Sequence, residues 1–264
     1  MTTAAVPMRP QPGTSSFRVL GVRVDAVQIP DVIHILEQWI AERDRAHYVA
    51  VTGMHGVSES QNDSYFRTAL QSSDLVVADG MPLVWLGRWH GFAMKRRVYG
   101  PELTAIFMQQ TGGRYRHFFY GGAPGVADKL AEVSRQRYGI NVVGTYCPPF
   151  RPLTPEEDAQ VVELINSAQP DLVWVGLSTP KQEKWMYEHR DKLNVPAMLG
   201  VGAAFDLNTG KLRQAPRWMR ENGLEWLFRL LAEPRRLWRR YLVNGSKFVW
   251  SVVLELTGLR SFSH

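Results

Sequence analysis

Several common chemistries are excluded by what this sequence lacks. It contains a single cysteine, Cys147, which excludes an internal disulfide and a cysteine-based zinc site and suits a reducing cytoplasm. It contains no apolar run near the roughly 20 residues that a membrane-spanning helix needs. The longest such stretch toward the C-terminal end covers only residues 248–256. Residues 1–16 lack the apolar core of a signal peptide and are rich in proline, serine, threonine and glycine, so we expect them to be disordered.

Two ligand-binding motifs are missing as well. No Asp-x-Asp pair occurs, so the sequence lacks the paired carboxylates that often hold Mn²⁺ or Mg²⁺ beside a diphosphate. We therefore expect no bound metal and no other cofactor. The glycine-rich stretch 120–127 does not have the G-x-G-x-x-G spacing of dinucleotide sites, because Pro124 and Gly125 break it. This absence argues against a nucleotide-dependent oxidoreductase.

The positive charge of the chain is confined to one region. The 264 residues include 45% hydrophobic and 21% charged residues, which is ordinary for a soluble globular protein of one large or two small domains. Residues 211–264 hold 11 basic and 4 acidic residues, whereas the preceding 210 residues hold 20 basic and 21 acidic ones. The net charge of +6 therefore lies in the last fifth of the chain and indicates a regional role.

Strand-like and helix-like segments alternate along most of the chain. Strands are predicted at residues 17–27 (as a pair or hairpin), 47–54, 74–80, 140–148 and 196–206, helices at 30–44, 57–73, 100–112 and 154–169, and strand–turn–helix units at 116–139 and 171–191. Thr154 and Glu157 have the spacing of a helix-capping box. The alternation predicts an α/β fold over residues 17–212, with a Rossmann-like, mostly parallel sheet and helices on both faces.

In such sheets ligands bind beyond the carboxyl ends of the strands. The loops to search are therefore residues 52–56, 79–82, 121–125, 177–183 and 202–210, the last of which contains Asp206. Asp79 leaves the end of a strand and is followed by Gly80 and Pro82. This pattern fits either a turn-forming aspartate or a carboxylate presented to a ligand.

Glycines and polar side chains mark two more of these loops. Gly121, Gly122 and Gly125 would let a phosphate approach the N–H groups at a helix start, although the same glycines also fit a simple turn. The first turn of a later helix carries Lys181, Gln182 and Glu183, which would either cap the helix or face a ligand. The amide of Gln182 can both donate to and accept from a base or a sugar.

Seven motifs occur in the order found in the WecG/TagA/CpsF family of bacterial glycosyltransferases, which the sequence resembles over residues 17–250. They are VTGMHGV, DLVVADGMPLVW, RRVYGPEL, YGGAPGVA, GLSTPKQEKW, GVGAAFDLNTGKLRQAPRWM and GLEWLFRLLAEPRRLWRRY. The resemblance implies inverting, metal-independent transfer of a sugar from a UDP-sugar to a polyprenyl-diphosphate-linked saccharide. It also implies a role in polysaccharide synthesis on the cytoplasmic face of the membrane.

The resemblance also assigns roles to individual residues. Asp79 matches the proposed catalytic base, Thr52 a residue that hydrogen-bonds substrate, and Arg97 an arginine that steadies the diphosphate or sugar. Gln182 matches a glutamine placed near the nucleotide or sugar. One departure concerns the first loop, where family members often have Thr-x-Asn but this chain has Thr52-Gly53-Met54-His55. The departure leaves the donor sugar open, with His55 either taking over a polar contact or simply exposed.

The basic tail, residues 213–264, alternates aromatic and apolar residues at helical spacing with arginines. From composition it fits three roles: association with an anionic membrane, nucleic-acid binding, or docking on its own domain. The resemblance favours a helical appendage that associates with the membrane, since the family's acceptor is a lipid. It argues against nucleic-acid binding. It also makes Arg213, Arg217 and Arg229 candidates for touching the diphosphate.

Two other functional classes remain open from the sequence. One is another nucleotide-binding Rossmann enzyme, and the other is a non-catalytic protein of polysaccharide assembly. The joint presence of Thr52, Asp79, Arg97 and Gln182 argues against the second class. The sequence leaves open whether the protein is a homo-oligomer.

Overall fold

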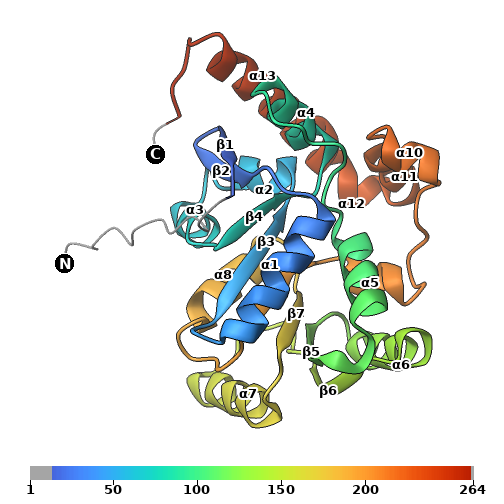
Figure 1. Ribbon diagram of the computed structural model, residues 1–264. Helices are drawn as coiled ribbons and strands as arrows, with labels where there is room; N and C mark the ends of the chain where they lie inside the picture. Colours follow the sequence, from blue (N-terminus) through green and yellow to red (C-terminus); the bar gives the residue numbers. More distant parts are fainter. Residues whose placement is uncertain (1–13, 263–264) are drawn as a thin grey trace. The chain divides into compact units, whose positions relative to one another are not determined.

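A computed structural model describes residues 14–262, which form two compact units. Of the described residues, the first unit comprises 14–28, 52–98 and 214–262, and the second comprises Ile29–Val51 and Tyr99–Arg213. Most of the segment expected to be disordered, residues 1–13, lies outside the described residues. The division into a domain at 17–212 and an appendage at 213–264 stays a prediction. Figure 1 labels the helices and strands of these units.

The second unit is built on parallel strands in the order β3-β8-β7-β5-β6. Their bounds are β3 (His47–Thr52, whose last residue is counted with the first unit), β5 (Arg116–Gly121), β6 (Asn141–Tyr146), β7 (Leu172–Gly176) and β8 (Ala197–Gly200). The helices are α1 (Ile29–Glu42), α5 (Gly100–Thr111), α6 (Val126–Tyr138), α7 (Pro155–Ala168), α8 (Lys181–His189) and α9 (Ala204–Asn208), with a 3₁₀ turn at Gly112–Arg114.

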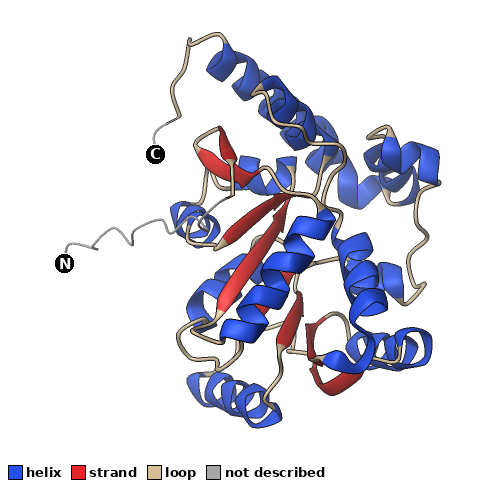
Figure 2. Ribbon diagram, in the orientation of Figure 1, coloured by secondary structure: helices blue, strands red, loops and turns tan. Residues whose placement is uncertain are grey.

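Both faces of this parallel sheet are covered, as expected for strands that are apolar along their whole length. Phe118 and Tyr120 pack in one buried cluster with residues of α7 and α8, such as Ile165 and Met186. On the other face Phe107 of α5 meets the ring of Trp174 edge-on, with centroids 5.7 Å apart. The alternation of side chains along β5 and β7 thus sends one set to each helical layer, and Figure 2 shows helices around these strands.

The first unit contains the strands β1 (Ser16–Val19) and β2 (Val22–Asp25), an antiparallel hairpin, and β4 (Leu75–Ala78), which pairs with β2 in parallel. Its helices are α2 (Met54–Glu59), α3 (Ser64–Gln71), α4 (Met81–Trp89), α10 (Arg217–Glu221), α11 (Glu225–Ala232), α12 (Pro234–Trp238) and α13 (Asn244–Leu256), with a π-helical turn at Arg239–Val243. Phe248 and Val252 of α13 are buried, and Glu255 accepts the backbone N–H of Leu20. No helix of residues 14–262 is long and apolar enough to cross a membrane.

The structure confirms the α/β class, and the predicted capping box at Thr154 is present. Three details of the sequence prediction are wrong. The helix expected over 57–73 is divided into α2 and α3, because Asp63 caps a new helix by accepting from the N–H of Phe66. The loop after Asp79 is helix α4, which tolerates Pro82 in its first turn. The last strand ends at Gly200, and its predicted continuation contains α9.

Candidate active site

Thr52, the last residue of β3, and Asp79, directly after β4, lie together in the first unit. The N–H of Asp79, directly after β4, donates to the carbonyl of Thr52 at 2.8 Å. The loops that follow approach each other closely, since a Cβ on Gly53 would lie 3.7 Å from the backbone nitrogen of Gly80. The Thr52 side chain is buried, and its Oγ1 has no hydrogen-bond partner among the described residues. A buried hydroxyl without a partner is uncommon, so Oγ1 is available for a ligand.

Asp79 lies beside the start of α4. Gly80 is the N-cap of this nine-residue helix and provides no side-chain cap. The N-terminal end of a helix dipole favours an ionised carboxylate nearby. The half-buried Asp79 therefore lies directly before the N-cap of α4, the end of the helix that favours anionic groups.

Arg97 completes this cluster, which is made of Thr52, Asp79 and Arg97 and is called the Asp79 cluster below. Its Nη1 donates to the carbonyl of Asp79 at 3.3 Å. The next residue, Val98, donates its N–H to the carbonyl of Ala78 at 2.8 Å, which ties this segment to the end of β4. The three residues that the sequence selected for catalysis therefore lie together in one unit, held by hydrogen bonds to the backbone of Asp79 and Thr52.

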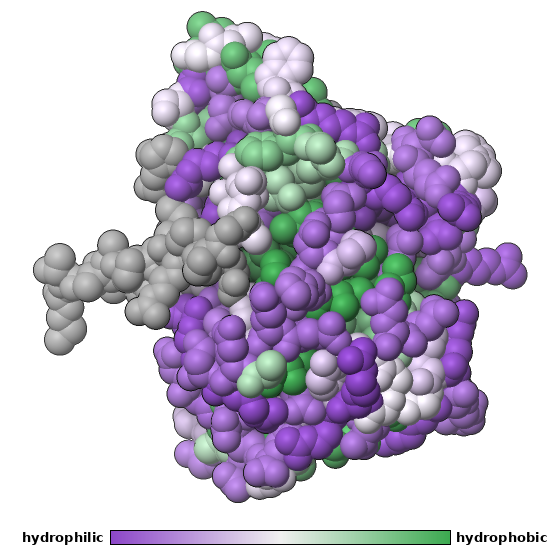
Figure 3. Space-filling view, viewed as in Figure 1, coloured by the Kyte–Doolittle hydropathy of each residue, from purple (hydrophilic) through white to green (hydrophobic). Residues whose placement is uncertain are grey.

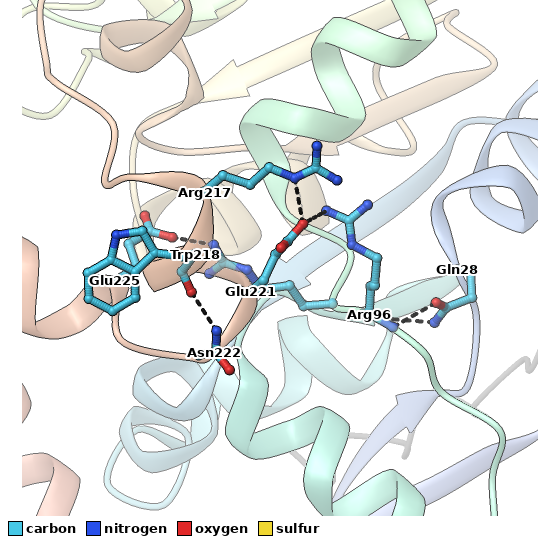
Figure 4. A network of polar contacts seen from close by, with 8 residues as sticks. Gln28, Arg96, Arg217, Trp218, Glu221, Asn222 and Glu225 are labelled. Atoms are coloured by element: carbon cyan, nitrogen blue, oxygen red, sulfur yellow. Dashed lines mark hydrogen bonds and ion pairs between the residues drawn. The ribbon is translucent and has the colours of Figure 1, made fainter.

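A residue that sequence reasoning did not select, Glu225, also belongs here. Nη2 of Arg97 forms an ion pair with the carboxylate of Glu225, in the first turn of α11 (Figure 4). Both side chains are largely buried, with 14% and 10% of their surfaces exposed. The only signal in the sequence was an acidic residue inside a basic tail, which is too weak to identify a partner 128 positions away.

The segment around α10 contacts the residue before Arg97, Arg96, through further polar interactions (Figure 4). Glu221 accepts from Nε of Arg217 at 2.7 Å and lies 3.8 Å from Arg96. The amide of Gln28 bonds the backbone N–H and carbonyl of Arg96, both at 3.0 Å. Among the other predicted residues of this unit, Arg229 is half-buried in α11 and His55 is half-buried in the first turn of α2.

The glycine loop of the second unit connects β5 to α6, and its role in phosphate binding stays a prediction. Gly121, Gly122 and Gly125 all have positive φ angles. A Cβ on Gly121 would lie 2.8 Å from the carbonyl carbon of Gly176, so this close approach of β5 and β7 requires glycine. Gly125 is the N-cap of the 13-residue helix α6 and supplies no side-chain cap. The N–H of Gly122 donates to the carbonyl of Gly176 at 3.0 Å, so any phosphate would have to meet N–H groups closer to the helix start at Gly125.

Gln182 and Glu183 form a buried polar pair at the start of α8. Nε2 of Gln182 donates to the carbonyl of Gly200 at 2.9 Å and to Oε1 of Glu183 at 3.1 Å. The hydroxyl of Thr179 donates to the same Oε1 at 2.8 Å. Oε1 of Gln182 and Oε2 of Glu183 have no hydrogen-bond partner among the described residues. Burial raises the pKa of Glu183 to about 7, so near neutral pH its carboxyl can serve as donor or acceptor.

The remaining predicted residues of this unit are more exposed. Lys181 is exposed beside Gln182 in α8, and Arg213 is exposed in the loop after α9. Asp206 of α9 forms an ion pair with Lys211 at 3.2 Å. The N–H of Leu212 donates to the carbonyl of Asp206 at 3.0 Å, so the chain folds back over this residue.

The buried carboxyl of Glu183 makes stability depend on pH. Its pKa is about 7 in the folded protein against 4.5 as the ordinary value, so its stabilising contribution is complete below pH 4.5 and is lost as pH rises through 7. Glutamine cannot ionise and keeps the same shape. We expect Glu183→Gln to gain up to about 3 kcal/mol in unfolding free energy relative to wild type between pH 4.5 and 8. Urea unfolding of both proteins across this range measures the difference.

The matched control is Glu188→Gln, at an exposed position of the same helix. Its unfolding free energy relative to wild type should stay nearly constant over the same range. A Glu183→Gln difference that is equally constant would contradict a buried, mostly protonated carboxyl.

Comparisons with known proteins agree with the resemblance found in the motifs. The model of the glycosyl transferase WecG/TagA/CpsF family matches residues 17–261. The chain is 29% identical over 232 residues to an N-acetylglucosaminyldiphosphoundecaprenol N-acetyl-beta-D-mannosaminyltransferase of Bacillus spizizenii. This alignment covers 87% of each of the two chains.

Proposed function

The chain belongs to the WecG/TagA/CpsF glycosyl transferase family, and on this premise we propose that it transfers a sugar from a UDP-sugar to a polyprenyl-diphosphate-linked saccharide. The transfer inverts the anomeric centre and needs no metal. The observation that carries the proposal is the Asp79 cluster, in which the backbone of Asp79 contacts Thr52 and the guanidinium of Arg97. The hydroxyl of Thr52 is buried there without a hydrogen-bond partner among the described residues. The name of the Bacillus spizizenii relative, which specifies a diphosphoundecaprenol-linked acceptor, supports the acceptor class.

In the proposed reaction Asp79 is the general base. It takes the proton of the acceptor hydroxyl while that oxygen bonds to the anomeric carbon, and the bond from this carbon to the diphosphate oxygen breaks, releasing UDP. Attack from the side opposite the leaving group inverts the anomeric centre. Oγ1 of Thr52 hydrogen-bonds the substrate, and Arg97 supplies positive charge to the diphosphate or sugar.

The nucleotide and sugar are assigned to residues of the second unit. The loop of Gly121, Gly122 and Gly125 is the candidate for a phosphate, which would lie at the start of α6 beside Gly125, because the N–H of Gly122 already donates to the carbonyl of Gly176 at 3.0 Å. The oxygens of Gln182 and Glu183 that have no partner among the described residues suit groups of the base or sugar. Lys181, Asp206 and His55 are further candidates for substrate contacts. Among residues 14–262 no three side chains of His, Cys, Asp or Glu gather as metal ligands.

Without a metal, cationic side chains and N–H groups must offset the charge that develops on UDP. The tail candidates for this role are Arg213, Arg217 and Arg229. In the structure Arg217 is 78% exposed and forms an ion pair with Glu221.

The test is UDP release by the purified protein in EDTA, with UDP-glucose, UDP-GlcNAc, UDP-ManNAc or UDP-glucuronate and a polyprenyl-diphosphate-linked sugar. We expect acceptor-dependent release with one donor. We also expect UDP, but not NAD, to raise the melting temperature, which separates this enzyme from other Rossmann enzymes. If no donor gave UDP release and UDP did not bind, the proposal would be overturned. Turnover would exclude a non-catalytic assembly protein.

We also propose that the protein is peripheral on the cytoplasmic membrane face and binds an anionic bilayer through α13. This helix is apolar on two sides. Phe248 and Val252 are buried against the unit, whereas Val249, Trp250, Val253 and Leu256 are exposed. Figure 3 shows hydrophobic residues among hydrophilic ones at the upper end of the view, where α13 lies in Figure 1. Exposed basic residues nearby in sequence, Arg235, Arg239 and Lys247, add attraction to anionic lipid.

Replacing Val249, Val253 and Leu256 together by glutamine is expected to weaken binding to anionic liposomes at least about tenfold, because three apolar side chains no longer enter the interface. Cosedimentation with vesicles containing phosphatidylglycerol measures the effect. The control replaces three exposed apolar residues elsewhere, Tyr65, Phe150 and Leu164, by glutamine. Deleting residues 224–264 should also weaken binding. Equal binding by the α13 variant and the control would contradict the membrane role of this face.

A further inference from the structure

We propose that Glu225 is a positioning residue for sugar transfer, which holds the guanidinium of Arg97 against the Asp79 loop. The inference rests on the proposed function, because it assigns a role within the same reaction. Glu225 does not need to touch substrate for this role. Its carboxylate acts through Arg97, with which it forms a largely buried ion pair (Figure 4).

Contacts on two of its nitrogens fix the guanidinium of Arg97. One guanidinium nitrogen, Nη2, is paired with Glu225, and the other, Nη1, donates to the carbonyl of Asp79 at 3.3 Å. A free arginine side chain populates many rotamers, and fixing it costs conformational entropy. Contacts on both nitrogens define the plane and the position of the guanidinium before a substrate arrives. Such preorganised charge is what stabilises a developing negative charge most effectively.

Glu225 is itself held in place by the packing of the residues before it. Gly223, two residues earlier, has a φ of 73° and packs against the start of α4. A Cβ at Gly223 would lie 3.1 Å from Cβ of Met81 and 3.3 Å from the ring of Trp85. Met81 is only two residues beyond Asp79. The beginning of α11 is therefore seated on the same short helix that begins at the Asp79 loop.

Glu225 differs from the nearby Glu221 in the burial of its ion pair. Glu221 pairs with Arg217 and Arg96 on the surface, where its side chain is 40% exposed and that of Arg96 is 57% exposed. Exposed pairs of this kind contribute little, because water and salt screen them. Removing one partner of a buried pair instead leaves a charge without compensation. The two acidic residues are thus four positions apart, but the ion pair of Glu225 is largely buried whereas those of Glu221 are exposed.

The arrangement makes the tail a part of the catalytic machinery through an acidic residue, although its net charge is positive. A rival role for Glu225 is competition, in which its carboxylate occupies Arg97 and excludes an anionic substrate. Competition predicts that removing the carboxylate strengthens substrate binding. Positioning predicts that removal lowers kcat, and the experiment separates the two roles.

The experiment measures kcat and KM for UDP release with the full-length Glu225→Gln protein and the donor found active for wild type. We expect kcat to fall about 10- to 100-fold with KM within about threefold, since a preorganised donor is misplaced. Glu225→Asp should recover part of kcat. The matched control Glu221→Gln should keep kcat within about twofold, because its ion pairs are exposed. Circular dichroism and melting temperature report whether each variant is folded.

A double-mutant cycle separates positioning from a general effect on folding. Glu225→Gln is combined with Arg97→Gln, and the loss in kcat is compared in the two backgrounds. If Glu225 acts through Arg97, its replacement lowers kcat in wild type but causes no further loss in Arg97→Gln.

An unchanged kcat, an equal loss in both backgrounds, or tighter substrate binding by Glu225→Gln would overturn the inference and leave the proposed function intact. If Glu225→Gln does not fold, the same cycle is run with Glu225→Asp. If the wild-type protein released no UDP with any donor, the proposed function would be overturned, and this inference with it.

Discussion

Asp79→Asn is expected to lower kcat for sugar transfer about 10²- to 10⁴-fold, the usual contribution of a general base. Asparagine keeps the shape of aspartate and its position directly after β4, but it cannot accept the proton of the acceptor hydroxyl. The backbone contacts that place residue 79, its N–H to Thr52 and its carbonyl to Arg97, do not depend on the side chain. Binding of UDP should therefore stay within about threefold of wild type.

Steady-state UDP release gives kcat, and calorimetric titration with UDP gives the binding constant. The control is Asp191→Asn, whose carboxylate is 90% exposed in the loop after α8. This variant should retain wild-type turnover. If Asp79→Asn also retained it, another group would have to be the base, and the role of the Asp79 cluster would be wrong.

Much of the architecture was predictable because its cause is local. Continuous apolar runs such as LVVA and LVWVG, each followed by polar or glycine-rich loops, are typical of strands buried on both faces. The rule that ligands bind at the carboxyl ends of such strands directed attention to Thr52 and Asp79. Boundaries were less predictable, since one capping residue, Asp63, divides a helical pattern into α2 and α3.

Other features depend on contacts between distant segments and leave no pattern in the sequence. Arg97 and Glu225 are 128 positions apart, and neither composition nor spacing pairs them. The burial of Glu183 could not be predicted from the sequence either, because its position in the first turn of α8 fits an exposed capping residue equally well. Its raised pKa comes from packing against residues of other elements, which only the folded chain brings together.

Arg97→Gln is expected to lower kcat about 10²- to 10³-fold, the range seen when one preorganised electrostatic donor is removed. Glutamine still donates a hydrogen bond but carries no charge to offset the leaving diphosphate. It also leaves the carboxylate of Glu225 buried without its partner, so some loss of stability should accompany the loss of turnover. Melting temperature and kcat, measured on the same preparation, report the two effects separately.

The neighbouring residue provides a closely matched control. Arg96 has the same charge and is adjacent in the chain, but its side chain is 57% exposed and its ion pair with Glu221 spans 3.8 Å on the surface. Arg96→Gln should therefore keep kcat within about twofold and barely change stability. Equal losses in the two variants would mean that net charge near the loop, rather than a fixed guanidinium, supports transfer. A large loss confined to Arg97 would instead assign the effect to the one arginine held between Asp79 and Glu225.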